Sequence, residues 1–328
     1  MKKSRWIAIA AAGIILAGLG MGALAYISSP RANAQASVLP EAATWMPASA
    51  NFVAHLDLVS IAASPIREEW ESSPHRQKFL DEVEEFREKT GLDPWNDFKT
   101  LSISTQRSDE SQSWGLALIG NLDQERIVSA IDEKETIERD TYEGTTLYVF
   151  SHAKGDNKED HALAFPSSST VLFGPPEYVR TMLDVGASRA PSAAEGALAG
   201  WAEELAFNDA FWCVGSAKDT LGQIMARQSE GSPQIPPIES FAISGNLESD
   251  FSMIARGRAA DQESAQKLAD VVRGFVALGS LQQQSKPEIQ AVLDSVQIQI
   301  LENTVEVYLA VPYETLRRLA HQNKEADQ

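Results

Sequence analysis

The chain has 328 residues, of which 43% are hydrophobic, and its formal net charge is −18 at pH 7. This length and apolar fraction suffice for one large domain or two small ones with hydrophobic cores, and they exclude a chain that is disordered throughout. The acidity, with no basic stripe after residue 36, argues against nucleic acid as a partner, because binding to phosphates requires clustered Lys and Arg. The single cysteine, Cys213, excludes an internal disulfide bond, and we expect it to be a small buried residue of a strand.

The first segment in chain order is an uncharged apolar stretch over residues 6–27, which begins with Trp6 and ends with Ile27. In a helix it would rise about 33 Å, enough to cross a hydrocarbon core of about 30 Å. It follows three basic residues, Lys2, Lys3 and Arg5. This arrangement predicts a single-pass anchor in a bacterial inner membrane, with the N-terminus inside and the body outside the cytoplasm. A cleaved signal peptide is the alternative, because an Ala-x-Ala pattern ends at Ala34; the body would then be periplasmic or secreted.

The remaining elements follow from residue spacing. Residues 28–44 are rich in Ser, Ala and Pro and are predicted to be a tether. Alternation of apolar residues predicts strands at 51–58, 100–105, 114–120, 145–151, 161–166, 171–173, 210–215 and 238–244. Helical spacing and capping residues predict helices at 64–91, 123–132, 176–184, 195–204, 221–228 and 312–319, and another that begins near residue 261.

The two halves of the chain show the same order of features, which predicts an internal duplication. The matched pairs, first half first, are residues 98–104 with 238–244, Trp114 with Phe251, and Thr170 with Thr304. Each unit is expected to have the order β-α-β-β-α-β-β-α, an α+β fold with largely antiparallel sheets and helices packed on one face. The predicted organisation is a membrane anchor or uncleaved signal (1–27), the tether (28–44), a first α+β unit (45–190), a helical connector (191–207), a second α+β unit (208–322) and a polar tail (323–328).

Three short motifs carry a family resemblance. Met-Pro-x-x-Ala-x-Phe-Val at 46–53 leads into the first strand, Ala-Ser-Pro at 63–65 begins a helix, and Thr-Gly-Leu-Asp-Pro at 90–94 precedes the next strand. The combination resembles a family of exported bacterial proteins of unknown function, membrane-tethered or secreted, with a duplicated α+β body. The resemblance implies the fold and the location outside the cytoplasm, and it implies no catalytic residue.

Two pairs of residues are candidate metal ligands. His55 and Asp57 lie two residues apart on one strand face, where two side chains could hold one ion, but no third ligand is apparent and a solvated strand face has the same pattern. His152 and His161 flank the acidic tip of a predicted hairpin and could meet across its strands, at most as a loose cation site. We therefore predict neither a metal centre nor a cofactor.

Motifs of catalysis are also missing from the sequence: there is no Gly-x-Ser-x-Gly elbow, no Ser-x-x-Lys with its partner motifs and no phosphate-binding glycine loop. The expected function is that of a membrane-anchored, non-catalytic extracytoplasmic protein that binds a protein partner or acts in envelope assembly. Two alternatives stay open. One is a carrier or sensor of an apolar ligand such as a lipid, and the other is a hydrolase without a recognisable motif.

Overall fold

The structure is a computed structural model, and it describes residues 39–65, 67, 76–107, 112–133, 135–154, 157–202, 204–217, 237–248, 250–282 and 286–326. The predicted anchor at residues 6–27 and the predicted helix at 221–228 lie outside these residues. Among the helices of the described ranges, none has both the length and the apolar character needed to cross a membrane.

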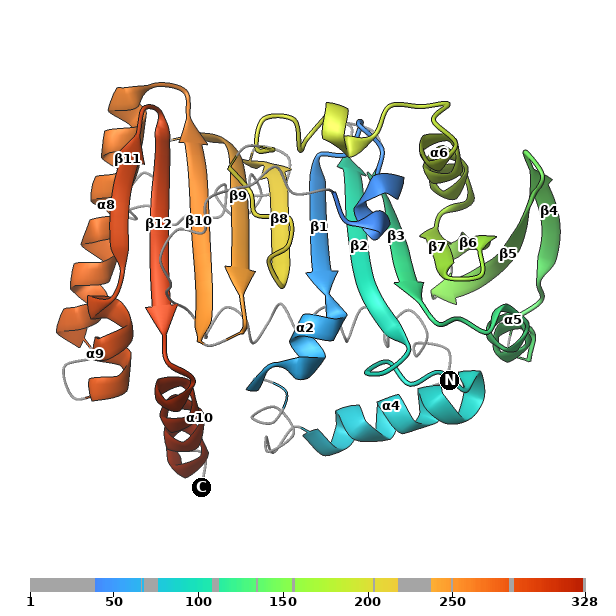
Figure 1. The fold of residues 1–328 in the computed structure, drawn as a ribbon, viewed down its shortest axis with the longest axis horizontal. Coiled ribbons are helices and arrows are strands. Elements are labelled where there is room, and N and C mark those ends of the chain that lie inside the picture. Colours follow the sequence, from blue (N-terminus) through green and yellow to red (C-terminus); the bar gives the residue numbers. More distant parts are fainter. Residues whose placement is uncertain are drawn as a thin grey trace.

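One antiparallel sheet of twelve strands runs through the described residues (Figure 1). Its strands in chain order are β1 (Phe52–Asp57), β2 (Phe98–Arg107), β3 (Gln112–Gly120), β4 (Glu138–Tyr142), β5 (Thr145–Lys154), β6 (Asn157–Ser167), β7 (Thr170–Gly174), β8 (Phe211–Ser216), β9 (Ile238–Asn246), β10 (Phe251–Ala259), β11 (Gln297–Leu301) and β12 (Thr304–Val311). The predicted α+β class with a largely antiparallel sheet is therefore confirmed, and both predicted units contribute to the same sheet.

The strand order is nearly symmetric about the pair β1 and β8. From β1 the sheet continues outward through β2, β3, β7, β6, β5 and β4, and from β8 it continues through β9, β10, β12 and β11. At the centre of this pair, Ala54 lies opposite Cys213 in an antiparallel register. The first half ends in the additional strands β5 and β4, whereas the second half ends at β11.

Helices lie on both faces of the sheet, which corrects the prediction that they pack on one face. The helices and 3-10 helices are η1 (Glu41–Trp45), α2 (Leu58–Ala63), α4 (Arg76–Thr90), α5 (Gln124–Asp132), α6 (Pro176–Gly186), η2 (Ala193–Glu195), α8 (Gln262–Gln282), α9 (Pro287–Asp294) and α10 (Tyr313–Ala326). We call the face that bears Val53 and Val214 face A, and the opposite face, which bears Ala54 and Cys213, face B. Because α6 and α8 pack on different faces, the sheet is covered from both sides.

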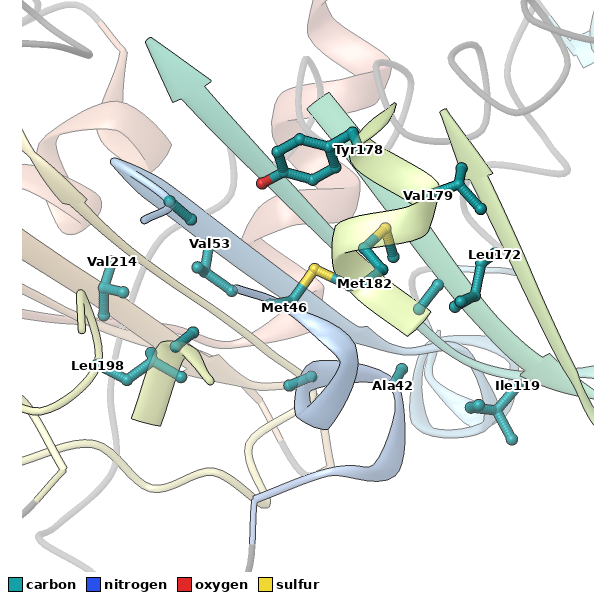
Figure 2. Close-up of a cluster of buried hydrophobic side chains, with 14 of the residues drawn as sticks. Ala42, Met46, Val53, Ile119, Leu172, Tyr178, Val179, Met182, Leu198 and Val214 are labelled. Atoms are coloured by element: carbon teal, nitrogen blue, oxygen red, sulfur yellow. The ribbon is translucent and has the colours of Figure 1, made fainter. Parts of the chain in front are cut away.

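The largest core cluster lies on face A (Figure 2). Its buried side chains come from η1, α6, the strands and the segment at 193–209, among them Met46, Met182 and Leu198. Helix α6 comes very close to β3, because a Cβ atom at Gly115 would lie 2.5 Å from the sulfur of Met182 and 2.5 Å from a ring carbon of Tyr178. Burial of this apolar surface is the main force that holds the segment at 193–209 against the sheet.

On face B, separate clusters hold the other helices. Ile131 of helix α5 belongs to a cluster with buried residues of β3 and β7, and Leu268 of α8 belongs to a cluster with Val305 of β12. In α8 the buried residues are Ala265, Leu268 and Ala269, all in the first half of the helix.

Several local predictions were wrong. The predicted tether at 28–44 is too long, because Glu41–Trp45 forms η1 and buries Ala42 and Ala43 in the core. The predicted polar tail at 323–328 is too long as well, because α10 extends to Ala326.

The first helix begins at Leu58, before the predicted start at residue 64. The chain enters helix α2 directly after β1, because the Asp57 side chain accepts hydrogen bonds from the amides of Val59 and Ser60 and so caps the helix. Strand β4 was missed because its residues are mostly charged and show no apolar alternation. The predicted helix at 195–204 is only the short η2 followed by turns, in which Trp201 and Leu205 are held by burial.

Candidate functional site

His55 is buried, contrary to the solvated strand face that its pattern suggested. Its side chain lies on face A, is 2% exposed, and its Nδ1 is 2.8 Å from the hydroxyl of Ser102. The imidazole stacks on the indole of Trp212 with ring centroids 5.3 Å apart. Burial lowers the pKa of His55 to about 4, and the nearby charge of Asp57 opposes this shift. The environment therefore favours a neutral imidazole that is held by packing.

Asp57 does not share a site with His55. Both of its carboxylate oxygens are used at the start of α2, where Oδ1 accepts from two backbone amides and Oδ2 accepts from the hydroxyl of Ser60 at 2.8 Å. A carboxylate at this position also interacts favourably with the positive end of the helix dipole. The two residues have different contacts in the structure: His55 packs against aromatic and hydroxyl groups, and Asp57 caps a helix.

His161 lies in an aromatic cluster on face B. Its ring is 5.6 Å from the ring of Phe173 and 5.9 Å from that of Trp114. His152 lies on β5 opposite Glu159, two pairs further along the ladder than Phe150 and His161, and its side chain is outside what the structure describes. Both strands of this hairpin are longer than predicted, so His161 is inside the sheet and away from the turn.

No group of three or more His, Cys, Asp or Glu side chains in the described ranges is arranged to hold a metal ion. Cys213 lies opposite Ala54 where the two halves of the sheet meet. Burial raises the pKa of the Cys213 thiol to about 12, so it is protonated at neutral pH and is a poor nucleophile.

A network of charged side chains connects the segment at 193–209 with the second half of the sheet. Arg256 of β10 donates from Nε to Glu306 of β12 at 2.8 Å, and both side chains are nearly buried. Arg258 donates to Glu204 at 2.6 Å, and its guanidinium lies 4.0 Å from the ring centroid of Trp201. Because each cation has a carboxylate partner, the network is locally neutral and serves to fasten the segment.

The outer edge of β11 has a different character. No strand in the described ranges pairs with this edge, and the partner of β11 on its inner side is β12. The strand has the sequence Gln-Ile-Gln-Ile-Leu and carries no charge, and the uncharged run extends from Ser295 to Leu301. Ile298 and Ile300 face α8 within a core cluster, while Leu301 is 48% exposed.

The opposite end of the sheet is protected by charge. Strand β4 contains Glu138, Arg139 and Asp140 in succession, and Asp140 forms an ion pair with Arg180 of α6 at 2.7 Å. Charged residues on an edge strand oppose its pairing with another chain. The two ends of one sheet therefore differ, and only the β11 end lacks this protection.

The second half of helix α8 carries exposed apolar side chains. Phe275, Leu278 and Leu281 recur every three residues and are 49%, 53% and 66% exposed. The run from Gly274 to Gln282 carries no charge. Helix α8 contacts β11, and the two form one end of the molecule (Figure 1). We call the surface formed by the outer edge of β11 and these three side chains the β11–α8 edge.

This edge was not predicted from the sequence. The wide apolar face between Leu268 and Leu281 is equally typical of a helix that packs in a filled core. The signal that was available is the absence of charge over 274–282 and over 295–301 in an acidic chain. This absence of charge indicates an interaction edge only once the sheet topology shows that β11 is a terminal strand.

Comparisons with known proteins give distant similarities only. No protein-family model matches the chain, and no curated protein matches it. The chain is similar to solved structures of TP0453 in crystal forms III, IV and I, with sequence identities of 8%, 9% and 6% and TM-scores of 0.49, 0.44 and 0.46. These matches cover 88%, 87% and 87% of this chain and 100%, 97% and 98% of the other. At such values the similarity supports no transfer of fold or function.

Proposed function

We propose that the chain is a non-catalytic interaction protein, held at the outer side of a membrane by its N-terminal segment, which binds a protein partner through the β11–α8 edge. The observation that carries the proposal is the uncharged terminal strand β11, with which no described strand pairs on the outer side. Such an edge offers a row of backbone N–H and C=O groups to an incoming strand. In this proposal, the partner adds a strand to β11 and covers Phe275, Leu278 and Leu281.

The proposed location rests on the apolar residues 6–27 and the basic residues that precede them. A tether over residues 28–38 reaches at most about 40 Å when fully extended. The body would therefore stay close to the membrane surface, where a partner on the same membrane is present at a high effective concentration. This arrangement makes a modest strand-addition surface sufficient for binding.

We also propose that the two halves arose by internal duplication, and the sheet registers support a refined alignment. Ser104 of β2 lies opposite Val53 of β1, and Ser244 of β9 lies opposite Trp212 of β8. If the two Ser residues occupy equivalent positions in the two halves, then Val53 and Trp212 do as well. A two-fold axis through the pair of Ala54 and Cys213 then relates the halves.

The residue pairs of the neighbouring strands in each half test the remaining sequence matches. With the two Ser residues equated, Thr170 corresponds to Thr304, as the sequence comparison suggested. Trp114 corresponds to Met253, two residues away from the Phe251 that the sequence comparison selected. In this alignment β11 corresponds to β6. The outer edge of β6 is covered by β5, whereas no described strand covers the outer edge of β11.

The proposed interaction is tested by photo-crosslinking in the native membrane. A photoreactive amino acid replaces Gln297, an exposed residue of β11, in the full-length chain. The matched control carries the same amino acid in place of Thr141, which lies on the edge strand β4. We expect a discrete crosslinked protein band from position 297 and none from position 141. Equal crosslinking from both positions, or none from position 297, would contradict the proposal.

The proposed anchor is tested separately by alkaline washing of membranes. We expect the full-length chain to remain in the membrane pellet, because an inserted apolar helix resists extraction at high pH. Recovery of a soluble form that begins at Gln35 would show cleavage after Ala34 and would remove the anchor from the account.

A further inference from the structure

We propose that the partner segment that pairs with β11 has a defined chemistry: about five uncharged residues in which apolar and polar side chains alternate, with a basic residue at each end. This inference rests on the proposed function, for which it states the kind of partner. The segment belongs to another protein, and it extends the sheet as a further strand on the outer edge of β11.

The charges at the two ends of β11 are the first argument. The uncharged run over 295–301 lies between Asp294, the last residue of α9, and Glu302, which begins the turn to β12, and both acidic residues are exposed. Asp294 accepts a hydrogen bond from the neutral amide of Gln290 at 2.9 Å. The ion pairs of the described second half use other carboxylates. Basic side chains at the ends of an added strand would therefore meet a carboxylate at each end of β11.

The charged side chains of α8, the helix that shares a core cluster with β11, neutralise one another. Lys267 pairs with Glu263 at 2.7 Å. Arg273 pairs with Asp270 at 2.8 Å. These four are the only charged residues of the helix, so α8 adds no net charge to the edge. The carboxylates at the ends of β11, in a chain of net charge −18, favour a partner with positive ends.

The two faces of β11 set the alternation of the partner. Ile298 and Ile300 lie on face B in the cluster with α8, and both are only partly buried. Gln299 lies between them on face A, where its side-chain amide donates to Glu306. Successive side chains of an added strand also point to opposite faces. Apolar side chains beside the two Ile residues would cover them, and the intervening polar side chains would lie beside the Gln residues of face A.

The length of β11 sets the spacing of the basic residues. The strand has five residues, so the positions just beyond its ends are those of Val296 and Glu302. A basic side chain at one end of the added strand would meet Glu302 directly. At the other end, the long side chain of Lys or Arg can extend past Val296 to Asp294. This spacing is the same for a parallel and an antiparallel partner.

The strand at the other end of the sheet does not suit the same segment. In β4 the charges of Glu138, Arg139 and Asp140 lie within the strand, and Asp140 already pairs with Arg180 of α6. An uncharged middle segment would face these charges without compensating them. We therefore expect the partner segment to bind at β11 and not at β4.

The main experiment measures peptide binding to the full-length chain in detergent micelles by fluorescence anisotropy. The probe is a labelled peptide with capped ends and the sequence Lys-Thr-Val-Thr-Val-Thr-Lys. A second peptide has Glu in place of both Lys residues, and a third has the composition of the probe in the order Lys-Val-Val-Thr-Thr-Thr-Lys. We expect the probe to bind and each of the other two to have a dissociation constant at least about tenfold higher. Absence of binding by the probe, or equal binding of all three peptides, overturns the inference.

Variants of the protein locate the binding. Glu302→Gln removes one acidic end and should raise the dissociation constant of the probe about threefold. Glu143→Gln is the matched control, because Glu143 is also exposed in a hairpin turn, with φ of 48° against 54° for Glu302. It should leave binding unchanged. Gln299→Lys, which adds a positive charge to the middle of the edge, should weaken binding of the probe as well. An equal effect of the two Glu variants would show a general attraction to acidic surface and would overturn the inference.

The native partner separates this inference from the proposed function. Mass spectrometry of the product of photo-crosslinking from position 297 identifies the segment that lies against β11. We expect an alternating segment with basic ends. A segment with acidic ends or without alternation, the β11 strand of a second copy included, overturns this inference and leaves the proposed function in place. If no protein is captured, both fail.

Discussion

The imidazole of His55 stacks on the indole of Trp212, with ring centroids 5.3 Å apart and an angle of 22° between the planes. The two residues face one another across β1 and β8, the strand pair that joins the two halves of the sheet. His55 also contacts the hydroxyl of Ser102 on the neighbouring strand β2. A titratable residue thus lies in the interior of the junction, where its protonation would act directly on the packing of both halves.

This position predicts that the protein loses stability as the pH falls from about 6.5 to about 4. In the unfolded chain His55 takes up a proton near pH 6.5, whereas burial lowers its pKa in the folded chain to about 4. Between these values the unfolded state binds more protons, so the free energy of unfolding rises with pH and is lost on acidification. The contribution of His55 is on the order of 3 kcal/mol. Urea unfolding of the full-length chain at pH 7, 6 and 5 measures it.

The matched variant is His55→Phe, which keeps an aromatic ring against Trp212 but cannot titrate. At pH 7 we expect it to be less stable by about 1 kcal/mol, because the buried hydroxyl of Ser102 loses its partner. Its unfolding midpoint should fall less steeply with pH than that of the wild type. Parallel pH dependences for the two proteins would show that His55 is not responsible.

The same residue shows where sequence patterns predict a fold and where they do not. The alternation over β1 correctly indicated a strand, but the apolar Phe52, Ala54 and Leu56 favour the opposite face as the buried one. In the structure Val53 and His55 are the buried pair, because η1 and the segment at 193–209 cover that face. Which face is covered depends on contacts with distant segments, and local alternation carries no information about them.

The buried ion pair of Arg256 and Glu306 gives a second prediction. Glu306→Gln should destabilise the fold by about 2–4 kcal/mol, because it leaves the guanidinium of Arg256 without its closest carboxylate in a nearly buried position. The exposed pair of Lys267 and Glu263 on α8 provides the control, and Glu263→Gln should leave the stability almost unchanged. Denaturant unfolding at neutral pH compares the two. Equal costs would mean that burial of the first pair has no energetic consequence.

The close approach of α6 to β3 gives a third prediction. Gly115→Ala should destabilise the protein by about 1–3 kcal/mol, because the new Cβ atom would overlap with the Tyr178 ring and with Met182. Gly274→Ala, on the exposed face of α8, has no heavy atom within 4 Å of its new Cβ atom. It should stabilise the helix by about 0.5–1 kcal/mol. Opposite signs in thermal unfolding are expected; a neutral Gly115→Ala would contradict the packing.

The candidate site could be predicted only in part. The lack of a catalytic motif led to the expectation of a binding protein, but the sequence could not show which surface binds. That β11 is a terminal strand depends on the order of twelve strands, and this order is set by pairings between residues far apart in the chain, such as Ala54 with Cys213. The charged β4, which protects the other edge, was missed because it lacks the apolar alternation by which strands were recognised.

The most direct test of the account is hydrogen exchange at β11 in the full-length chain embedded in its membrane. The account predicts that peptides covering residues 297–301 exchange slowly, because another strand pairs with the outer edge of β11. In Gln299→Lys these amides should exchange faster, while those of residues 138–142 in β4 stay unchanged. If β11 in the wild type exchanges as fast as the terminal strand β4, no strand covers it, and the proposed interaction edge is wrong.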